Sequence, residues 1–311
     1  MKNATQSLKR LARSASFVTG LSAFMARRRP WMRILVYHGV VPSEADGFDQ
    51  QVAYLAERFS IVPLEAIVKK LSDPRAKPSR ELALTFDDGL RNQYSVVYPI
   101  LKRRNLPATF FVCPGLIDSG RWIWNHEARE RVRSLPGERR AELSRALQAP
   151  GQETEQIIEW MKDLGIEARK RAEDTVRTAT PDFAPTAADC SNFDIMSWDE
   201  LSAIDPGLIT IGSHTCNHPI LTSLSDAELQ SELRDSRAQL EKRLGRPVEH
   251  FCYPNGTYDD RVARCVREHY RSGVTMRAGE VIAGCNVHTL PRTPSANDLS
   301  LLAWRMLRPA A

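Results

Sequence analysis

The stretch LALTFDDGLRNQY, residues 82–94, ends an apolar run with two adjacent carboxylates, Asp87 and Asp88, followed by Gly89. Neighbouring like charges repel each other, so we expect something at this point of the chain to offset or use them. A simple Asp-Asp-Gly turn is the alternative, because Asp-Gly is a common turn pair. The run before the pair is continuously apolar, which is typical of a strand buried on both faces and not of a hairpin arm. The stretch therefore predicts a buried strand that delivers charge at its carboxyl end.

Strand-like and helical patterns alternate on both sides of this stretch. The other apolar, strand-length runs are residues 33–40, 107–115, 207–213 and 248–256. Helical spacing of apolar residues occupies most of 49–71, interrupted by a short strand, and then 93–106, 225–245 and 260–269. This alternation predicts α/β architecture, with a parallel sheet and crossover helices, either open or closed into a barrel.

One segment, from about residue 116 to 194, departs from the pattern because it is charged, helical and poor in strand formers. We interpret it as a helical insertion in a single domain spanning 31–300, with a basic segment at 1–30 and a tail at 301–311. Two helix starts carry the Ser-x-x-Glu capping pattern, at Ser197 with Glu200 and at Ser225 with Glu228.

Composition excludes some classes of function. The chain has 311 residues, with 43 Lys and Arg against 38 Asp and Glu, a net charge of +5. The sequence has no dense stripe of aromatic and basic residues, so it does not predict nucleic-acid binding. The basic N-terminus could contact a membrane surface, although a solvated tail is the simpler interpretation.

The compartment is predicted from the cysteines and from the N-terminal segment. Six cysteines without a CxxC pair indicate reduced thiols. Residues 14–26 are too short and too weakly apolar for a membrane span or a signal peptide. We therefore expect the cytoplasm or the inner membrane surface.

Polar residues collect at four expected strand ends. They are His38, the Asp87–Asp88 pair, His214 with His218, and residues 253–256. Because functional sites of parallel α/β folds lie at the carboxyl ends of the strands, these residues are expected to form one site.

The sequence HTCNH places His214 and His218 four residues apart, a spacing that directs two imidazoles to one side of a helical turn. Taken alone, such a pair is common on solvated faces. Together with a carboxylate from TFDDG it makes a set suited to one divalent metal, and the second carboxylate is then free to act on water. Zinc is favoured, and cobalt, nickel and manganese are alternatives.

These motifs resemble those of the polysaccharide deacetylases with the NodB-homology domain, carbohydrate esterase family four. The first family motif, TFDDG, is residues 85–89, and the second is the HTxxH of residues 214–218. The resemblance covers roughly 33–294, without the helical insertion. It implies a distorted (β/α)7 barrel and metal-dependent removal of N-acetyl groups from amino sugars. By position, Asp87 is implied as the general base and Asp88, with both histidines, as a metal ligand.

The third motif departs from the family pattern of Arg-x-Pro-Tyr. Here FCYPNG places Cys252 at the position of the arginine that usually holds the base, and Asn255 at the position of the tyrosine. The resemblance implies substrate and oxyanion contacts at Tyr253, Pro254 and Asn255, with the Asn255 backbone amide as the oxyanion donor. Arg292 in LPRTP is a candidate substitute for the missing arginine.

The general acid is the second departure, because the family's Leu-x-His motif is not evident near the C-terminus. His38, at the end of the first strand, resembles the permuted arrangement in deacetylases of biofilm poly-N-acetylglucosamine systems, and we assign it as the acid. His288 is the reserve. Trp122 and Trp124 in GRWIWNHE could stack on a sugar ring or could equally be packing residues.

The leading hypothesis is a metal-dependent hydrolase that deacetylates N-acetylhexosamine units of a polysaccharide or lipid-linked glycan. One alternative keeps the fold and metal but acts on a small non-sugar amide or imide. Another is a glycan-binding protein without turnover, which the absent arginine would explain. A purely structural domain does not account for four polar strand ends.

Overall fold

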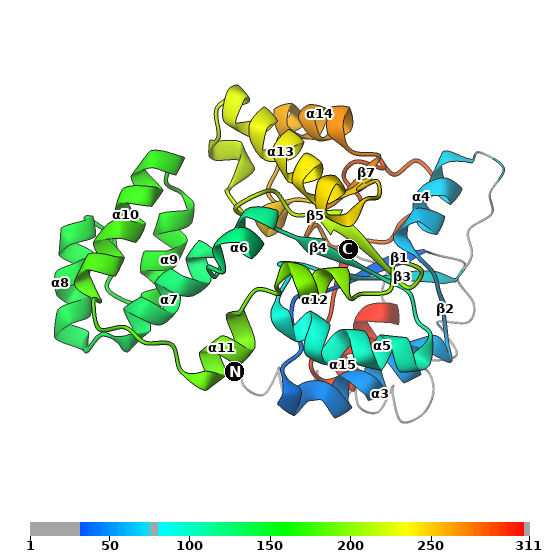
Figure 1. The fold of residues 1–311 in the computed structure, drawn as a ribbon, viewed down its shortest axis with the longest axis horizontal. Coiled ribbons are helices and arrows are strands. Elements are labelled where there is room, and N and C mark those ends of the chain that lie inside the picture. The colour runs from blue at the N-terminus through cyan, green and yellow to red at the C-terminus, as the bar shows by residue number, and fades with distance from the viewer. Residues whose placement is uncertain (1–31, 74, 76–79, 308–311) are drawn as a thin grey trace, which may run out of the picture.

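The computed structural model describes residues 32–73, 75 and 80–307 (Figure 1). Its strands form one parallel sheet in the order β7-β6-β5-β4-β3-β1-β8, and β2 pairs beside β3. Their bounds are β1 Arg33–Tyr37, β2 Ser60–Ile61, β3 Glu81–Phe86, β4 Ala108–Val112, β5 Ile209–Ser213, β6 His250–Cys252, β7 Ser272–Val274 and β8 Thr293–Pro294.

The segment before β8 joins the two ends of the sheet. The Gly273 amide of β7 donates to Val287 O at 2.9 Å, and the Leu290 amide donates to Gly273 O at 2.8 Å. The same segment continues into β8, where Thr293 lies opposite Leu35 of β1. Residues 287–294, which we call the closing segment, thus bring β7 and β1 together around a ring of seven strands. The expected distorted (β/α)7 barrel is confirmed.

The two faces of β3 show how the sheet places its residues. Leu84 and Phe86 point outward into the main core beneath the surrounding helices. Ala83 belongs to the separate inner cluster of the barrel, and alternation along the strand puts Thr85 and Asp87 on that inner side. The strand therefore directs Asp87 into the barrel at its carboxyl end.

Crossover helices cover the outside of the sheet, with α13 and α14 on one side and α3, α5 and α15 on the other (Figure 1). The expected capping boxes at Ser197 and Ser225 are confirmed, since each hydroxyl accepts a hydrogen bond from the amide three residues on. The helices outside the insertion are α3 Ala45–Ala56, α4 Leu64–Ser72, α5 Tyr98–Arg104, α6 Pro114–Ser119, α12 Trp198–Ser202, α13 Asp226–Leu244, α14 Asp260–His269 and α15 Leu299–Leu307.

The helix α15 corrects the expectation of a tail at 301–311. Leu302 and Met306 are fully buried in the main core, because the apolar residues of this segment recur at helical spacing and pack on α3. Residues 299–307 therefore belong to the domain.

The insertion forms a helical bundle to one side of the barrel (Figure 1). It has a hydrophobic core of its own, which includes Ile157 and Met161. Its return to the barrel runs antiparallel to the residues that follow TFDDG, with Leu90 paired to Ile195 and the Met196 amide donating to Gly89 O at 3.0 Å. The helices of the insertion are α7 Trp124–Ser134, α8 Gly137–Leu147, α9 Thr154–Lys162, α10 Ile166–Ala179 and α11 Ala187–Phe193.

The basic segment at 1–30 lies outside the described residues. Within the part of the chain that the structure describes, no helix has both the length and the apolar character needed to cross a membrane.

Candidate metal centre and active site

Asp88, His214 and His218 converge at the carboxyl ends of β3 and β5. The Asp88 Oδ1 atom lies 3.4 Å from His214 Nε2 and 3.6 Å from His218 Nε2. All three side chains are almost completely buried, and their ligand atoms lie within 4.8 Å of one another. The two residues nominated from HTCNH and the carboxylate from TFDDG therefore share one small volume.

The spacing of these atoms fits a divalent cation. Ligands placed about 2.1 Å from a zinc ion at tetrahedral angles lie about 3.4 Å from one another. The second ring nitrogen of His214 is also oriented, since Nδ1 lies 2.8 Å from the Cys252 carbonyl oxygen. A backbone acceptor of this kind fixes the tautomer that leaves Nε2 free to bind a metal. The donor set thus suits zinc and its first-row neighbours.

The charges around the set are arranged for a cation. Burial raises the pKa of Asp88, but the hydrogen bond with His214 and the electrostatic effect of the surrounding imidazoles outweigh burial, so the pKa lies well below its usual range. Burial, together with the neighbouring His214, lowers the pKa of His218 to about 3. Asp88 is therefore an anion and His218 a neutral imidazole at neutral pH, which are the forms that ligate metals. For His214, burial lowers the pKa but interactions with Cys252 and Asp88 outweigh it and raise the pKa, so this imidazole must give up a proton when a metal binds.

The loops of the site have an unusual backbone. Among the described residues, six other than glycine have positive φ, and four of them lie in the three motifs: Asp88, Thr215, His218 and Asn255. Each such conformation costs on the order of 1–3 kcal/mol and persists only where surrounding contacts enforce it. In HTCNH one such contact is internal, because the His218 amide donates to Thr215 Oγ1 at 3.0 Å.

Asp87 does not join the metal ligands but binds Arg292 of the closing segment. The guanidinium donates from Nη1 to Asp87 Oδ1 at 2.7 Å and from Nη2 to Oδ2 at 2.6 Å, and both side chains are buried. Burial raises the pKa of Asp87, but the charge and hydrogen bonds of Arg292 outweigh it and lower the pKa. Asp87 is thus an oriented carboxylate beside the donor set.

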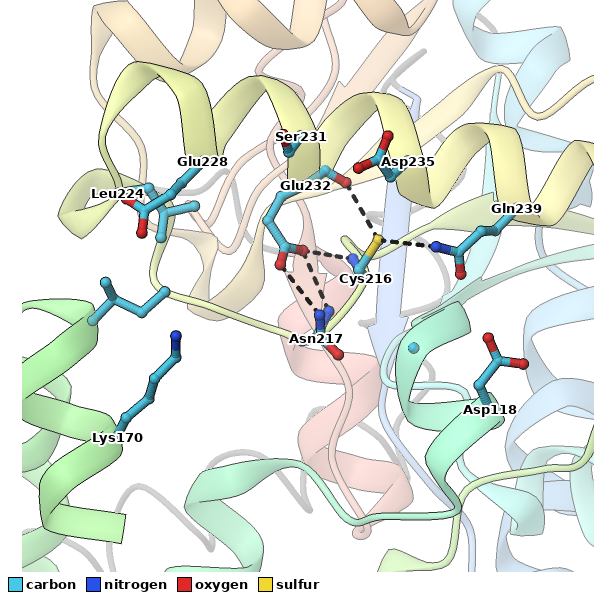
Figure 2. Close-up of a pocket in the computed structure, with 12 residues that line it drawn as sticks. Asp118, Lys170, Cys216, Asn217, Leu224, Glu228, Ser231, Glu232, Asp235 and Gln239 are labelled. Carbon is cyan, nitrogen blue, oxygen red and sulfur yellow. Dashed lines mark hydrogen bonds between the residues drawn. The ribbon is translucent and has the colours of Figure 1, made fainter. Parts of the chain in front are cut away.

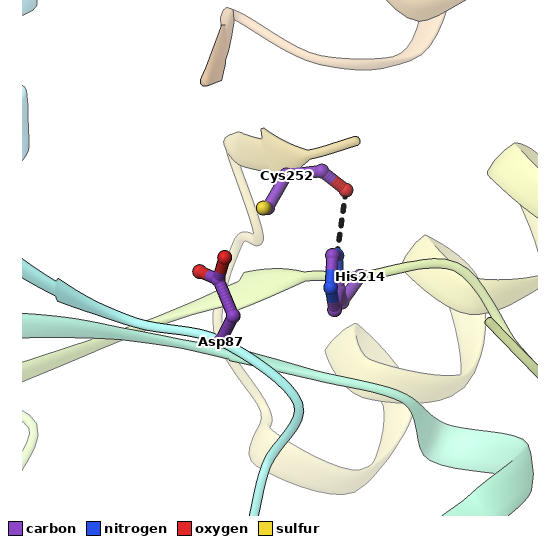
Figure 3. Close-up of side chains that lie close together, drawn as sticks. All are labelled: Asp87, His214 and Cys252. Atoms are coloured by element: carbon purple, nitrogen blue, oxygen red, sulfur yellow. Dashed lines mark hydrogen bonds between the residues drawn. The ribbon is translucent and has the colours of Figure 1, made fainter. Parts of the chain in front are cut away.

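Cys252 explains why the arginine comes from a different strand. Its Sγ lies 3.3 Å from Arg292 Nη2, so the small side chain at the usual arginine position leaves room for a guanidinium from the closing segment. Figure 3 shows Cys252 above Asp87, with its carbonyl bonded to His214. These three side chains are close enough to hold a second ion. However, both Asp87 oxygens already bind Arg292, so we assign the metal to the Asp88 set.

His38 follows β1, and its side chain is exposed. Its electrostatic effect on Asp87 and Asp88 favours the ionised carboxylates, as do the larger effects of Arg292 on Asp87 and of His214 on Asp88. The Gln93 side-chain amide links the backbone after β1 to the backbone after β3, because it donates to His38 O at 2.8 Å and to Asp87 O.

The reserve acid lies elsewhere. His288 Nε2 contacts Tyr270 O, at 3.1 Å, and Tyr270 precedes β7, at the amino end of that strand. Because Asp88, His214 and His218 lie at the carboxyl ends of their strands, this position does not support His288 as the acid.

The third motif divides its residues between core and surface. Tyr253 is completely buried, and its hydroxyl donates to His288 O at 2.8 Å, so this side chain is a packing residue and not a substrate contact. Pro254 is buried as well, whereas Asn255 is exposed in a left-handed turn. Of the three residues, only Asn255 stays a proposal for substrate contact.

Sugar stacking on Trp124 is not supported by its position. The side chain is buried in the core of the insertion, and Arg169 covers its ring at 4.9 Å. The tryptophan faces inward because it begins α7, whose apolar side packs against α9 and α10. Trp122 is only half-buried and packs against Phe193, while its indole N–H donates to Asp194 Oδ1 at 2.9 Å.

Two residues of the site were missed by sequence reasoning although they stand in the opening stretch. Asn92 accepts a hydrogen bond from the Val40 amide and donates to the carbonyls of Ser191 and Asn192, while Gln93 holds His38 and Asp87. Polar residues are common at the start of a helix, so the sequence offers no reason to single these two out. Their burial distinguishes them from ordinary helix-start residues, and burial is visible only in the structure.

Comparison with known proteins gives one family. The sequence model described as "Polysaccharide deacetylase" matches residues 75–272. The Bacillus subtilis (strain 168) protein YxkH, named for the same activity, is 21% identical over 291 residues, which span 90% of this chain and 77% of that protein.

Two solved structures share the fold. The Streptococcus pyogenes deacetylase PplD, in complex with acetate, has a TM-score of 0.61 at 21% identity and covers 90% of this chain and 99% of its own. IcaB from Ammonifex degensii has a TM-score of 0.60 at 19% identity, covering 90% and 98%.

Proposed function

The chain belongs to the polysaccharide deacetylase family, whose members hydrolyse N-acetyl amide bonds, and on that premise we propose that it deacetylates N-acetylhexosamine units of a polysaccharide or lipid-linked glycan with the help of one divalent metal. The observation that carries the proposal is the buried donor set of Asp88, His214 and His218 with an oriented carboxylate, Asp87, beside it. Zinc is the favoured metal for two imidazoles and one carboxylate.

In this proposal Asp88, His214 and His218 hold the metal. When bound, a divalent cation polarises the acetamide carbonyl and makes the attacking water more acidic. The protein's part is to keep Asp88 ionised and the imidazoles aimed inward, which the Cys252 carbonyl does for His214. Burial excludes bulk water and so strengthens these interactions.

Asp87 is proposed as the general base that accepts a proton from the attacking water. Its two hydrogen bonds to Arg292 fix the plane of the carboxylate and keep it ionised. A base held in this way has the correct protonation state and position before substrate arrives.

His38 is proposed as the acid that protonates the leaving amine. It is exposed at the strand end next to the aspartates, and Gln93 ties its backbone to that of Asp87. The Asn255 backbone amide is proposed to donate to the oxyanion, and its left-handed conformation turns the backbone sharply after Pro254.

The experiment measures acetate release from N-acetylated chito-oligosaccharides and from poly-N-acetylglucosamine by the metal-loaded enzyme. We expect Asp87→Asn to lower the rate by about 10²–10⁴-fold, and His38→Ala by about 10²-fold or more. His288→Ala is the matched control, because this histidine contacts Tyr270 at the other end of the barrel, and it should retain wild-type activity.

The outcomes separate the parts of the proposal. Acetate release that survives Asp87→Asn would remove that residue as the base. A wild-type protein that binds metal yet releases acetate from neither glycan would overturn the glycan substrate and leave hydrolysis of a small amide, or binding alone, to be tested.

The compartment also stays a proposal. All six cysteines are free thiols, which supports a reducing environment such as the cytoplasm or the inner membrane surface.

A further inference from the structure

The loop that carries the two histidines is held from outside as well as from within. Residues 215–217, which we call the metal loop, pass between α6 and α13. On the α6 side, the Gly115 amide donates to Cys216 O at 3.0 Å. The approach is close, because a Cβ on Gly115 would lie 2.5 Å from Asn217 Oδ1 and 2.9 Å from Cys216 O. The loop therefore has little freedom on this side.

On the α13 side, one carboxylate receives three hydrogen bonds from the metal loop. Glu232 Oε2 accepts from the Cys216 amide at 2.8 Å and from the Asn217 amide at 3.3 Å. Its Oε1 accepts from Asn217 Nδ2, also at 3.3 Å. Figure 2 shows Glu232 reaching from α13 to Cys216 and Asn217 of the loop.

Among the described residues this carboxylate forms no salt bridge, although Arg169 interacts with it electrostatically, and burial raises its pKa against the opposing effect of the loop amides. Partial burial of a carboxylate costs free energy, because the charge loses contact with water. Hydrogen bonds from the loop offset this cost, and the carboxylate in turn satisfies loop amides that would otherwise lack an acceptor. These amides belong to the metal loop, where Thr215 has positive φ, and His218 directly after the loop has positive φ as well. Such a backbone persists only when its surroundings enforce it.

We propose that Glu232 is a positioning residue that locks the metal loop and thereby sets His218 at the correct distance from His214 and Asp88. The inference rests on the metal site of the proposed function and adds a residue outside the motifs. Loss of the three hydrogen bonds frees the loop to relax toward ordinary φ values, which moves the His218 imidazole away from the other two ligands.

The test compares Glu232→Gln with Asp235→Asn. Both residues lie on α13 and line the same cavity of about 400 Å³, so neither substitution leaves a packing void, and both remove one negative charge. Asp235 accepts a hydrogen bond from Arg234, and its charge acts on Cys216 although no hydrogen bond joins it to the loop among the described residues, so it controls for charge. Glutamine keeps the shape of Glu232 but offers the loop a single acceptor oxygen.

The measurement is the affinity of the full-length, metal-free protein for Zn²⁺, determined by competition with a chelator, with the absorption spectrum of the Co²⁺ form as a second reading. We expect Glu232→Gln to weaken Zn²⁺ binding by about 10–100-fold and to alter the Co²⁺ spectrum. Asp235→Asn should change neither. Urea unfolding of the metal-free variants shows whether any loss is general.

Wild-type affinity and spectrum in Glu232→Gln would overturn the inference even if the variant were less stable. Equal weakening by Asp235→Asn would also overturn it, because the effect would then be that of charge. If the wild type itself binds no metal, it is the proposed function that fails, and the two failures are thereby distinguished.

Discussion

At the scale of single residues, the pairing of Asp87 with Arg292 sets the energetics of the site. Both groups are buried, so each charge depends on the other to offset the cost of leaving water. Removing one partner leaves an unpaired charge in a medium of low dielectric constant. The pair is therefore needed for stability as well as for the orientation of Asp87, the proposed base.

This dependence predicts a non-additive pair of substitutions. Arg292→Met should lower the free energy of unfolding by about 3–5 kcal/mol, because it leaves the Asp87 carboxylate buried without a partner. Adding Asp87→Asn to that variant should restore part of the loss, since the orphaned charge disappears. Urea unfolding of the two single variants and the double variant measures the coupling, and additive losses would contradict it.

A second buried ionisable residue lies away from the metal site. His250 begins β6, its Nδ1 pairs with Ser272 Oγ at 2.8 Å, and Nε2 lies 3.6 Å from Glu65 Oε2. Burial lowers its pKa to about 4, an effect that Glu249 opposes and Arg271 reinforces. In the unfolded chain the imidazole has its ordinary pKa of about 6.5.

The difference in pKa predicts sensitivity to acid. Between about pH 6.5 and pH 4 the unfolded chain binds a proton that the folded protein does not, so stability falls as the pH is lowered through this window. His250→Gln should remove about 2–3 kcal/mol of the stability lost between pH 7 and pH 4.5. Urea unfolding of the wild type and of His250→Gln at both pH values tests this. Equal losses of unfolding free energy in the two proteins would refute it.

The proposed metal ligands and the proposed base could be nominated from sequence because each motif is contiguous and follows a buried strand. Their neighbours could not. Arg292 lies 205 residues from Asp87 in sequence, and nothing local to LPRTP indicates which carboxylate it meets. Glu232 stands on an otherwise ordinary helical face of α13, so its contact with the metal loop depends on how α13 packs on the barrel.

At the scale of elements, Asn92 connects three segments around the site. Its Oδ1 accepts from the Val40 amide, just after His38, and its Nδ2 donates to two carbonyls of α11. The side chain is buried, so each of these groups has lost water as an alternative partner. Asn92 thus ties the loop after β1 to the return of the insertion.

Asn92→Asp tests this connection with almost no change of shape. The carboxylate can still accept from Val40, but it cannot donate and it faces the carbonyls of Ser191 and Asn192. We expect a loss of about 1–3 kcal/mol in unfolding free energy and faster hydrogen exchange in α11. Unchanged exchange in α11 would show that other contacts hold the helix.

Elements with strong local signals were predicted well, and the shortest strands were not. The helix α13 carries a capping box at its start and Gly245 at its end, and both are present in the structure. By contrast, β7 has three residues and β8 has two, one of which is a proline. Such strands exist because their neighbours supply hydrogen-bond partners, which is information that the local sequence does not hold.

At the scale of the whole molecule, two hydrophobic cores share one chain. The barrel and the insertion have separate clusters, but Ile195 packs against both, and it also pairs with Leu90, the residue after TFDDG. We therefore expect the insertion to unfold together with the barrel, in agreement with its interpretation as part of one domain.

Ile157→Ala in the insertion and Ile211→Ala in the barrel test this expectation. Each deletes buried methyl groups and should cost about 2–5 kcal/mol. If the cores are coupled, each variant shows a single transition at lower urea, coincident by tryptophan fluorescence and circular dichroism. An earlier, separate transition in Ile157→Ala alone would show that the insertion folds independently.

The closing segment has a consequence for when activity can arise. During synthesis the TFDDG carboxylates leave the ribosome some two hundred residues ahead of Arg292, the group that orients Asp87, the proposed base. A nascent or clipped chain can hold both aspartates and both histidines and still lack an aligned Asp87. Under the proposed mechanism, hydrolysis therefore requires the complete ring of strands, and we expect fragments that lack the closing segment to be inactive.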